Sequence, residues 1–149
     1  MTDRFLCDAM LGKLATYLRM CGYDTAYALD REVEADDAVR ELARDEDRRL
    51  LTRDAALAAR TAAAIRLTAR DIEGQLDELR EAGVPLSLPE RPRRCGRCNG
   101  PLAPVDASTA TPADAPDPAE TDVWQCRRCG GHFWMGSHWD DVRRRLNDG

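Results

Sequence analysis

Short apolar runs alternate with segments of helical periodicity along the first 90 residues. The strand-like runs cover residues 4–7, 25–29, 49–52 and 64–67. Helical patterns follow them over residues 11–21, 35–47, 55–63 and 72–83; in the first, apolar side chains recur at the i, i+3, i+4 and i+7 spacing of one helix face. Because parallel strands are joined by crossover helices, this order predicts an α/β domain with a mainly parallel sheet.

The chain changes character after this domain. Residues 85–94 are rich in proline and arginine, as in a linker, and residues 95–149 are too few and too polar to form a second large core. We therefore predict two domains, 1–90 and 91–149, the second being a linker and a small metal-stapled module. Within the module, residues 103–122 are mostly small, proline or polar and predict a mobile loop at its tip.

Two C-x-x-C pairs stand in the second domain: Cys95, Cys98, Cys126 and Cys129. Four thiolates at about 2.3 Å form a closed tetrahedral Zn(II) site, which adds folding energy and leaves no open position for catalysis. Redox dithiols and an iron-sulfur site are the alternatives. Loss of the zinc, as in Cys126→Ala, is expected to unfold residues 95–149 and leave the first domain folded.

The segment from His132 to Trp139 collects three of the eight aromatic residues. Either His132 or His138 could replace a cysteine on the metal, but four thiols already close the shell. The rings can form the ribbon core and its docking face. Alternatively, His138 and Trp139 can contact the bases and phosphates of a nucleic acid.

Charge excludes a general electrostatic binder of nucleic acid. The chain has 22 basic and 27 acidic residues and a net charge of -5. Because neither domain carries a strong positive field, such a partner must be held by local patches. The start of the chain lacks the basic head and long apolar run of a signal peptide, so we expect a cytoplasmic protein with no membrane partner.

Acidic residues gather at one predicted sheet edge. Asp8 follows the first strand and Asp54 the third, and the carboxyl ends of parallel strands share one edge, where ligands bind. Asp36 or Asp37, at the start of a helix, can join them. A hard divalent cation such as Mg(II) or Mn(II) relieves the repulsion between such carboxylates and activates water.

Basic residues are predicted beside these acids: Lys13, Arg19 and Arg53 could hold a phosphate backbone. Each acid taken alone also has a structural explanation, because Asp is common after strands and at helix N-caps.

Several segments together resemble the Mut-seven C-terminal RNase family. They are FLCDAMLGKLATYLRMCGYDTAY, DDAVRELA, RRLLTRDAAL, GQLDEL, RCGRCN and CRRCGGHFWMGSHW, from Phe5 to Trp139. The resemblance implies a PIN-like, three-layer nuclease domain followed by a zinc ribbon, and a metal-dependent RNase.

In this family pattern the acids correspond to Asp8, Asp36 and Asp54. Asp36 is favoured over Asp37 because it stands seven residues before Ala43. Asp71 is a possible fourth acid, although the residues around it match poorly. The long loop between the cysteine pairs departs from the shorter family loops.

Two rival functions follow from the same residues. A response-regulator receiver also has acids after its first and third strands, but it needs a lysine after a late strand, and the only lysine here is Lys13. A noncatalytic RNA-binding or adaptor protein would use the ribbon and leave the acidic cleft idle. The RNA substrate, endo- or exonucleolytic attack and the oligomeric state stay open.

Overall fold

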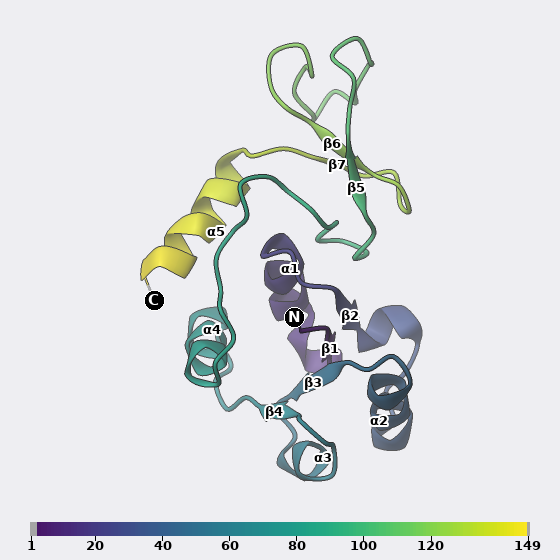
Figure 1. Cartoon of the computed structure of the whole chain (residues 1–149), viewed down its shortest axis with the longest axis vertical. Coiled ribbons are helices and arrows are strands. Elements are labelled where there is room, and N and C mark those ends of the chain that lie inside the picture. Colours follow the sequence, from purple (N-terminus) through teal and green to yellow (C-terminus); the bar gives the residue numbers. More distant parts are fainter. Residues whose placement is uncertain (1–2, 149) are drawn as a thin grey trace.

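The computed structural model describes residues 3–148, and its centre is a parallel sheet of four strands (Figure 1). The strands are β1 (Phe5–Cys7), β2 (Thr25–Tyr27), β3 (Arg49–Thr52) and β4 (Ile65–Arg66), in the order β2-β1-β3-β4. The crossover helices are α1 (Gly12–Met20), α2 (Asp36–Asp45) and α3 (Ala55–Ala59), and α4 (Ile72–Glu81) follows β4. Two 3-10 turns, η1 (Ala9–Leu11) and η2 (Ala28–Arg31), follow β1 and β2. The predicted α/β class is confirmed.

Side chains alternate between the two faces of the sheet and so divide the core in two. Phe5 and Cys7 of β1 point to the face that is covered by α1 and α4. Leu6 and Leu50 point to the opposite face, where they pack against Val39 of α2. The sheet is therefore the middle of three layers, as period-two alternation in buried strands requires.

A second, antiparallel sheet forms the ribbon. Its strands are β5 (Leu102–Pro104), β6 (Trp124–Cys126) and β7 (His132–Phe133), in the order β5-β6-β7. The long connection between β5 and β6 is closed at its base, where the amide of Val105 donates to the carbonyl of Val123 at 2.8 Å. It reaches away from the parallel sheet, at the far end of the ribbon (Figure 1).

The sequence analysis predicts no helix after residue 83, yet α5 (Ser137–Asp148) follows the ribbon. Val142 and Leu146 of α5 are 0% and 5% exposed and belong to the same core cluster as Phe5. The guanidinium of Arg80 on α4 also donates to the carbonyl of Leu146. The signal was present, because Trp139, Val142 and Leu146 stand at i, i+3 and i+7.

Element boundaries also differ from the predicted ones, and two of these differences mark turns. The helix after β3 stops at Ala59 rather than residue 63, and Ala63 takes a left-handed φ of 61° as the chain turns into β4. The second strand stops at Tyr27, where η2 begins. Alanine-rich composition favours a helix, but the turn that brings Ile65 into the core overrides this local preference.

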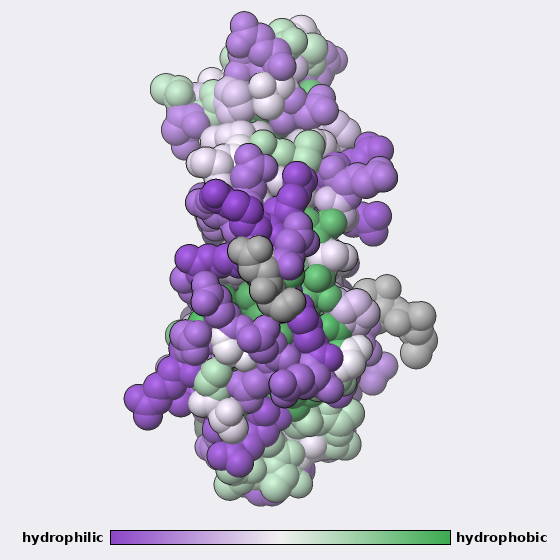
Figure 2. Space-filling view, turned by 90° about the vertical axis from the view of Figure 1, so that its left-hand side faces the viewer, coloured by the Kyte–Doolittle hydropathy of each residue, from purple (hydrophilic) through white to green (hydrophobic). Residues whose placement is uncertain are grey.

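Hydrophilic residues cover most of the α5 side of the molecule (Figure 2). Apolar atoms appear on this face in a band at mid-height and as a pale patch at the bottom, over the region of the alanine-rich α3. Among residues 3–148, no helix has the length and apolarity to cross a membrane.

The turn that carries the first cysteine pair, residues 95–99, lies directly on the first domain. We call it the docking turn. Thr16 and Arg19 of α1 both donate to the carbonyl of Gly96, at 3.3 and 3.1 Å. Asn99 is buried; its side-chain oxygen accepts from the amide of Thr25 at 3.0 Å. The ribbon is thus fastened to α1 and to the start of β2.

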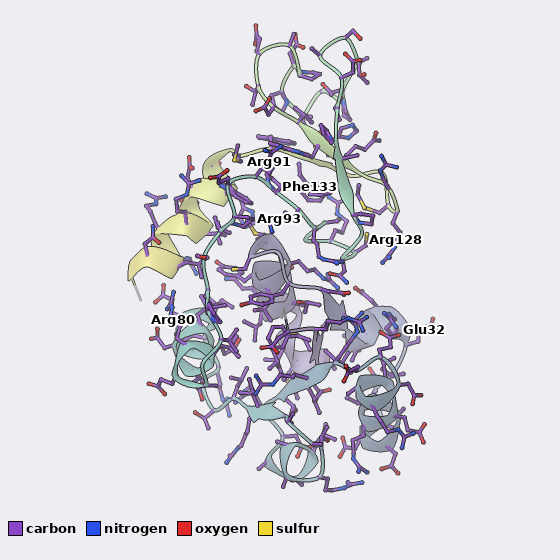
Figure 3. All side chains as sticks on the ribbon, viewed as in Figure 1. Glu32, Arg80, Arg91, Arg93, Arg128 and Phe133 are labelled. Carbon is purple, nitrogen blue, oxygen red and sulfur yellow. The ribbon has the colours of Figure 1, made fainter. Side chains whose placement is uncertain are left out.

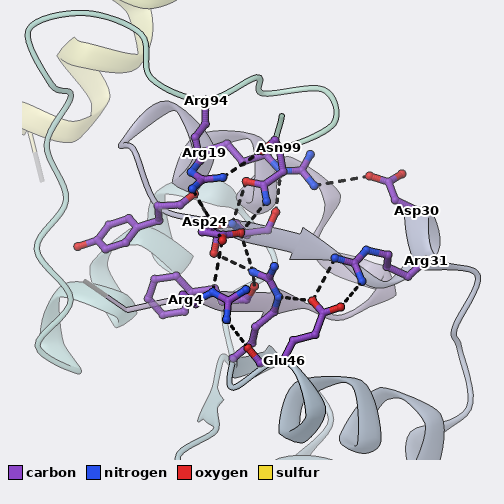
Figure 4. Close-up of polar contacts among 12 residues, drawn as sticks. Arg4, Arg19, Asp24, Asp30, Arg31, Glu46, Arg94 and Asn99 are labelled. Atoms are coloured by element: carbon purple, nitrogen blue, oxygen red, sulfur yellow. Dashed lines mark hydrogen bonds and ion pairs between the residues drawn. The ribbon is translucent and has the colours of Figure 1, made fainter. Parts of the chain in front are cut away.

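Asp24 is the centre of the charges beneath this turn (Figure 4). Its Oδ1 accepts from Asn99 at 2.7 Å and from Arg48 at 2.8 Å, and Arg94 of the linker lies 3.8 Å from its Oδ2. Burial of Asp24 opposes ionisation, but the hydrogen bonds from Asn99 and Arg48 and the nearby positive charges hold its pKa well below the usual range. One carboxylate therefore joins the parallel sheet region to the docking turn and the linker.

Candidate functional site

Two of the predicted acids meet at the carboxyl edge of the parallel sheet. Asp8 follows β1 and is 6% exposed, and its Oδ2 accepts from the hydroxyl of Thr52 at 2.7 Å. The same Thr52 oxygen accepts from the backbone amide of Asp54 at 3.0 Å. Because β1 and β3 are parallel neighbours, Thr52 at the end of β3 links the carboxylate of Asp8 to the backbone of Asp54.

Local capping orients both acids. Asp8 Oδ1 accepts from the amide of Ala9 at the start of η1. Asp54 is the N-cap of α3, where its Oδ1 accepts from the amides of Ala56 and Leu57 at 3.0 and 3.1 Å. Within the described part of the chain, Asp54 Oδ2 has no hydrogen-bond partner, so one oxygen of this carboxylate is available to a ligand.

Tyr27 at the end of β2 contacts the segment that follows Asp8. Its hydroxyl donates to the carbonyl of Ala9 at 2.6 Å. A Cβ on Gly12 would lie 3.0 Å from the Tyr27 hydroxyl oxygen. Burial, and then the negative charges of Asp30, Cys7 and Asp8, raise the pKa of Tyr27. This contact explains a glycine at position 12, and it holds η1 and the start of α1 beside Asp8.

In the described part of the chain, neither Asp36 nor Asp37 hydrogen-bonds to the residues that surround Asp8 and Asp54. Asp36 opens α2 and is half-buried, whereas Asp37 is exposed and pairs with Arg60 at 2.8 Å. Among residues 3–148, the four cysteines are the one group of three or more Cys, His, Asp or Glu residues whose ligand atoms all lie within 4.8 Å of one another. The roles of Asp36 and Asp37 at a metal site stay predictions.

The possible fourth acid has a structural role. Asp71 is the N-cap of α4, and its Oδ2 accepts from the amide of Gly74 at 3.2 Å. That hydrogen bond satisfies a free amide of the first helical turn.

The predicted cations divide into exposed and buried ones. Lys13 is exposed in the first turn of α1, close in sequence to the acidic edge, and Arg53 lies between Thr52 and Asp54. The Nε of Arg53 is buried with no hydrogen-bond partner among residues 3–148. Burial opposes ionisation of Glu78, but two backbone amides, the Thr68 hydroxyl and the charge of Arg53 lower its pKa.

Arg19 cannot hold a phosphate backbone as the sequence analysis expects. It is 3% exposed, and its Nε donates to the carbonyl of Thr25 at 2.8 Å in addition to its bond with Gly96. Arg19 lies on the buried side of α1 with its guanidinium under the docking turn. Its charge therefore stabilises the contact between α1 and that turn.

The cysteine centre has the dimensions of a tetrahedral metal site. Cys95 Sγ lies 3.6 Å from Cys129 Sγ, and Cys98 Sγ lies 3.5 Å from Cys126 Sγ. These separations are close to the value of about 3.8 Å that tetrahedral Zn–S bonds of about 2.3 Å require. The four predicted ligands therefore could bind zinc and close a zinc ribbon.

Backbone groups prepare the sulfurs for a cation. Burial opposes ionisation of Cys126, but the amides of Cys129 and Arg128 reach its sulfur at 3.4 and 3.3 Å and bring its pKa down to about 7. Burial raises the pKa of Cys95 to about 12, a cost that a bound cation would offset. A Cβ on Gly100 would lie 2.7 Å from Cys126 Sγ, so this position has room only for glycine.

Sequence reasoning missed the residues that connect these sites. Thr52 stands directly before the R-D pair and ends a strand, which is a usable signal. Asp24 and Asn99 are 75 residues apart, and neither belongs to a periodic pattern. Their contact depends on how the docking turn sits on the sheet, and no local signal in the sequence reports it.

Comparisons with curated proteins and with solved structures found no match to this chain. The model of the Mut7-C RNAse domain family matches residues 3–146, which is nearly the whole chain. The match covers the sheet, the acidic edge, the docking turn and both cysteine pairs. The chain therefore belongs to the Mut7-C RNAse domain family.

Proposed function

We propose that this protein is a metal-dependent ribonuclease that hydrolyses RNA phosphodiester bonds at the acidic edge. The observation that carries the proposal is the link formed by the Thr52 hydroxyl, which bonds the carboxylate of Asp8 after β1 and the backbone amide of Asp54 after β3. Family membership supports RNase chemistry in general, and the edge offers the carboxylate oxygens that such chemistry needs.

Asp8 and Asp54 would hold Mg(II) or Mn(II). Asp36 or Asp37 would add a third carboxylate if α2 shifted toward the ion. Oxygen ligands suit these hard ions. When bound, such an ion activates a water as nucleophile and offsets charge that develops on the phosphate. Lys13 is exposed in the first turn of α1, five residues after Asp8, and would steady the phosphate, with Arg53 in a similar role.

RNA must approach a first domain that repels it, because residues 1–90 carry 13 basic and 19 acidic side chains. Binding therefore depends on exposed arginines of the linker and ribbon, namely Arg91, Arg93, Arg127 and Arg128. Arg94 is engaged with Asp24 and Asn99 and contributes less. The zinc ribbon would hold the strand, and single-stranded or loop RNA fits these separated contacts.

The test is Mn(II)-dependent cleavage of a varied pool of RNAs by wild-type protein and Asp54→Asn. Asparagine keeps the Oδ1 acceptor that caps α3, so this variant should stay folded. We expect cleavage to fall at least about a hundredfold while RNA binding is retained or tightened, because a negative charge leaves the cleft. Asp114→Asn, in the exposed loop of the ribbon, is the control for loss of one carboxylate and should cleave as wild type does.

A noncatalytic adaptor is the alternative outcome of the same experiment. It would be favoured if wild-type protein left every RNA intact with Mg(II) or Mn(II), yet still bound RNA through the ribbon. In that case Asp54→Asn would bind no differently from wild type.

A further inference from the structure

A pocket of about 350 Å³ lies between α1, the linker and the start of α5. Phe133, Trp134 and Trp139 supply aromatic walls, and Met20 of α1 adds a flexible apolar side. This volume is at the lower end of the range for small-ligand pockets. Aromatic walls at this size suit one flat ring system.

The charged side chains that line the pocket are both arginines. Arg94 and Arg97 line it together with His138, and no Asp or Glu does, although acids outnumber basic residues in the chain. Arg97 is exposed and forms no ion pair with the described residues. His138 and Trp139 of the pocket come from the first turn of α5, and Asp140 of the same turn does not line it. An anionic group beside the ring system would therefore be stabilised.

Trp139 adds a donor that lacks an acceptor. The residue is 4% exposed, and its indole Nε1 is buried with no hydrogen-bond partner in the described part of the chain. Buried indole N–H groups usually have a partner. Trp139 also lines the pocket, so a ligand bound there would supply the missing acceptor once the ring turns toward it.

One face of α1 connects this pocket with the acidic edge. Lys13, Thr16 and Met20 stand at i, i+3 and i+7, so they form a single stripe along the helix. Lys13 stands five residues after Asp8 in the chain, in the first turn of α1, and Thr16 and Met20 line the pocket. The axial distance from Lys13 to Met20 is about 10 Å at 1.5 Å per residue, so an RNA strand can contact both ends of this stripe within a few nucleotides.

Figure 3 shows Phe133 on the ribbon side of the linker that carries Arg91 and Arg93.

We propose that this pocket binds one unpaired nucleobase of the RNA strand. The base stacks between the aromatic walls, one of its carbonyl oxygens accepts from Trp139 Nε1, and its phosphate lies against Arg97. The inference rests on the proposed function because it takes RNA as the ligand. It adds a site that binds a single nucleotide at a distance from the reacting phosphate.

The test scans a single-stranded RNA of about 12 nucleotides, removing one base at a time, for binding to the zinc-loaded Asp54→Asn protein. Stacking of one base predicts a loss of affinity of about five- to hundredfold at one position and little loss elsewhere. In Phe133→Leu or Trp139→Phe protein this dependence on position should weaken or vanish. Arg97→Ala should weaken binding of every RNA in the series, and Arg145→Ala, at the far end of α5, is the matched control.

A second measurement follows RNA binding without a variant of the pocket and uses Trp139→Phe only to assign one signal. The three tryptophans give three indole N–H signals in a nitrogen-proton NMR spectrum, which Trp139→Phe assigns. Addition of the intact RNA should move the Trp139 signal, and the base-deleted RNA of low affinity should not. A shift of the Trp124 signal alone would overturn the proposal, because Trp124 lines a different pocket.

The outcomes separate this inference from the proposed function. A flat scan together with metal-dependent cleavage by wild-type protein would overturn the base pocket and leave the nuclease standing. Loss at one position without any cleavage would support the pocket and overturn the nuclease. If RNA neither bound nor moved the Trp139 signal, both would fall, and a protein partner would become the better occupant.

Discussion

Hydrogen bonds decide what each acidic residue can do. Asp54 and Asp71 both cap helices, but only the backbone of Asp54 is linked to a second acid, Asp8, through Thr52. The meeting of Asp8 and Asp54 could be predicted, because the ends of parallel strands share an edge. The role of Asp24 could not, since its partners come from distant parts of the chain.

Asp24 leads to a prediction about acid stability. Its pKa is lower in the folded protein than the value of about 3.9 expected when unfolded. Its contribution is therefore complete above about pH 4 and is lost as the pH falls toward 2. We expect wild-type protein to lose more stability over this range than Asp24→Asn, on the order of 1–2 kcal/mol after solvent screening.

Urea unfolding at pH 5 and pH 2.5 measures this difference. Asp114→Asn, in the exposed loop of the ribbon, is the control and should keep the wild-type dependence. Glu46, whose pKa is lowered to about 2 by its bonds with Arg31 and Arg48, leaves some dependence in both variants. Equal losses in wild type and Asp24→Asn would contradict the role of Asp24.

The docking turn shows how two elements can fit closely without any periodic signal. A Cβ on Gly96 would lie 3.2 Å from the Cγ2 of Thr16, so the turn approaches α1 at a position with little spare room. The strand and helix types of the first domain could be predicted because each buries one face. The fit between turn and helix depends on single methyl groups, which no pattern reports.

Gly96→Ala should therefore destabilise the protein by about 1–3 kcal/mol through overpacking. Thr16→Ser removes Cγ2 and keeps the hydroxyl that bonds Gly96. The double variant should recover most of the loss, and Thr16→Ser alone should change stability little. Chemical unfolding of the four proteins gives the coupling energy, and additive effects would show that the contact is not responsible.

The whole molecule is more closely joined than a domain with an appended module. Before the ribbon strands, the docking turn contacts α1. After them, α5 packs into the core cluster that contains Phe5. The division at residues 90 and 91 stays a prediction from sequence. The expectation that residues 95–149 unfold alone on loss of the metal needs revision, because Val142 and Leu146 share a core with Phe5.

We expect one zinc per chain and a coupled loss of structure when it is removed. Cys126→Ala should lower the melting temperature of the whole chain by about 10 °C or more, if the ribbon and α5 detach at a cost of several kcal/mol. Tryptophan fluorescence reports the ribbon and α5, and far-ultraviolet circular dichroism reports all the helices. Coincident transitions would support coupling. A fluorescence change without any shift in the dichroism transition would show that the first domain is independent.

The hydrogen bond between Val105 and Val123 has a practical consequence for experiments on this protein. It brings both ends of the long ribbon loop together, so the chain between them can change length at little entropic expense, about 0.6 kcal/mol for each doubling. A fluorophore or an affinity tag placed there would stand far from the acidic edge. The same loop could be exchanged for a short hairpin, giving a smaller protein suited to crystallisation with RNA.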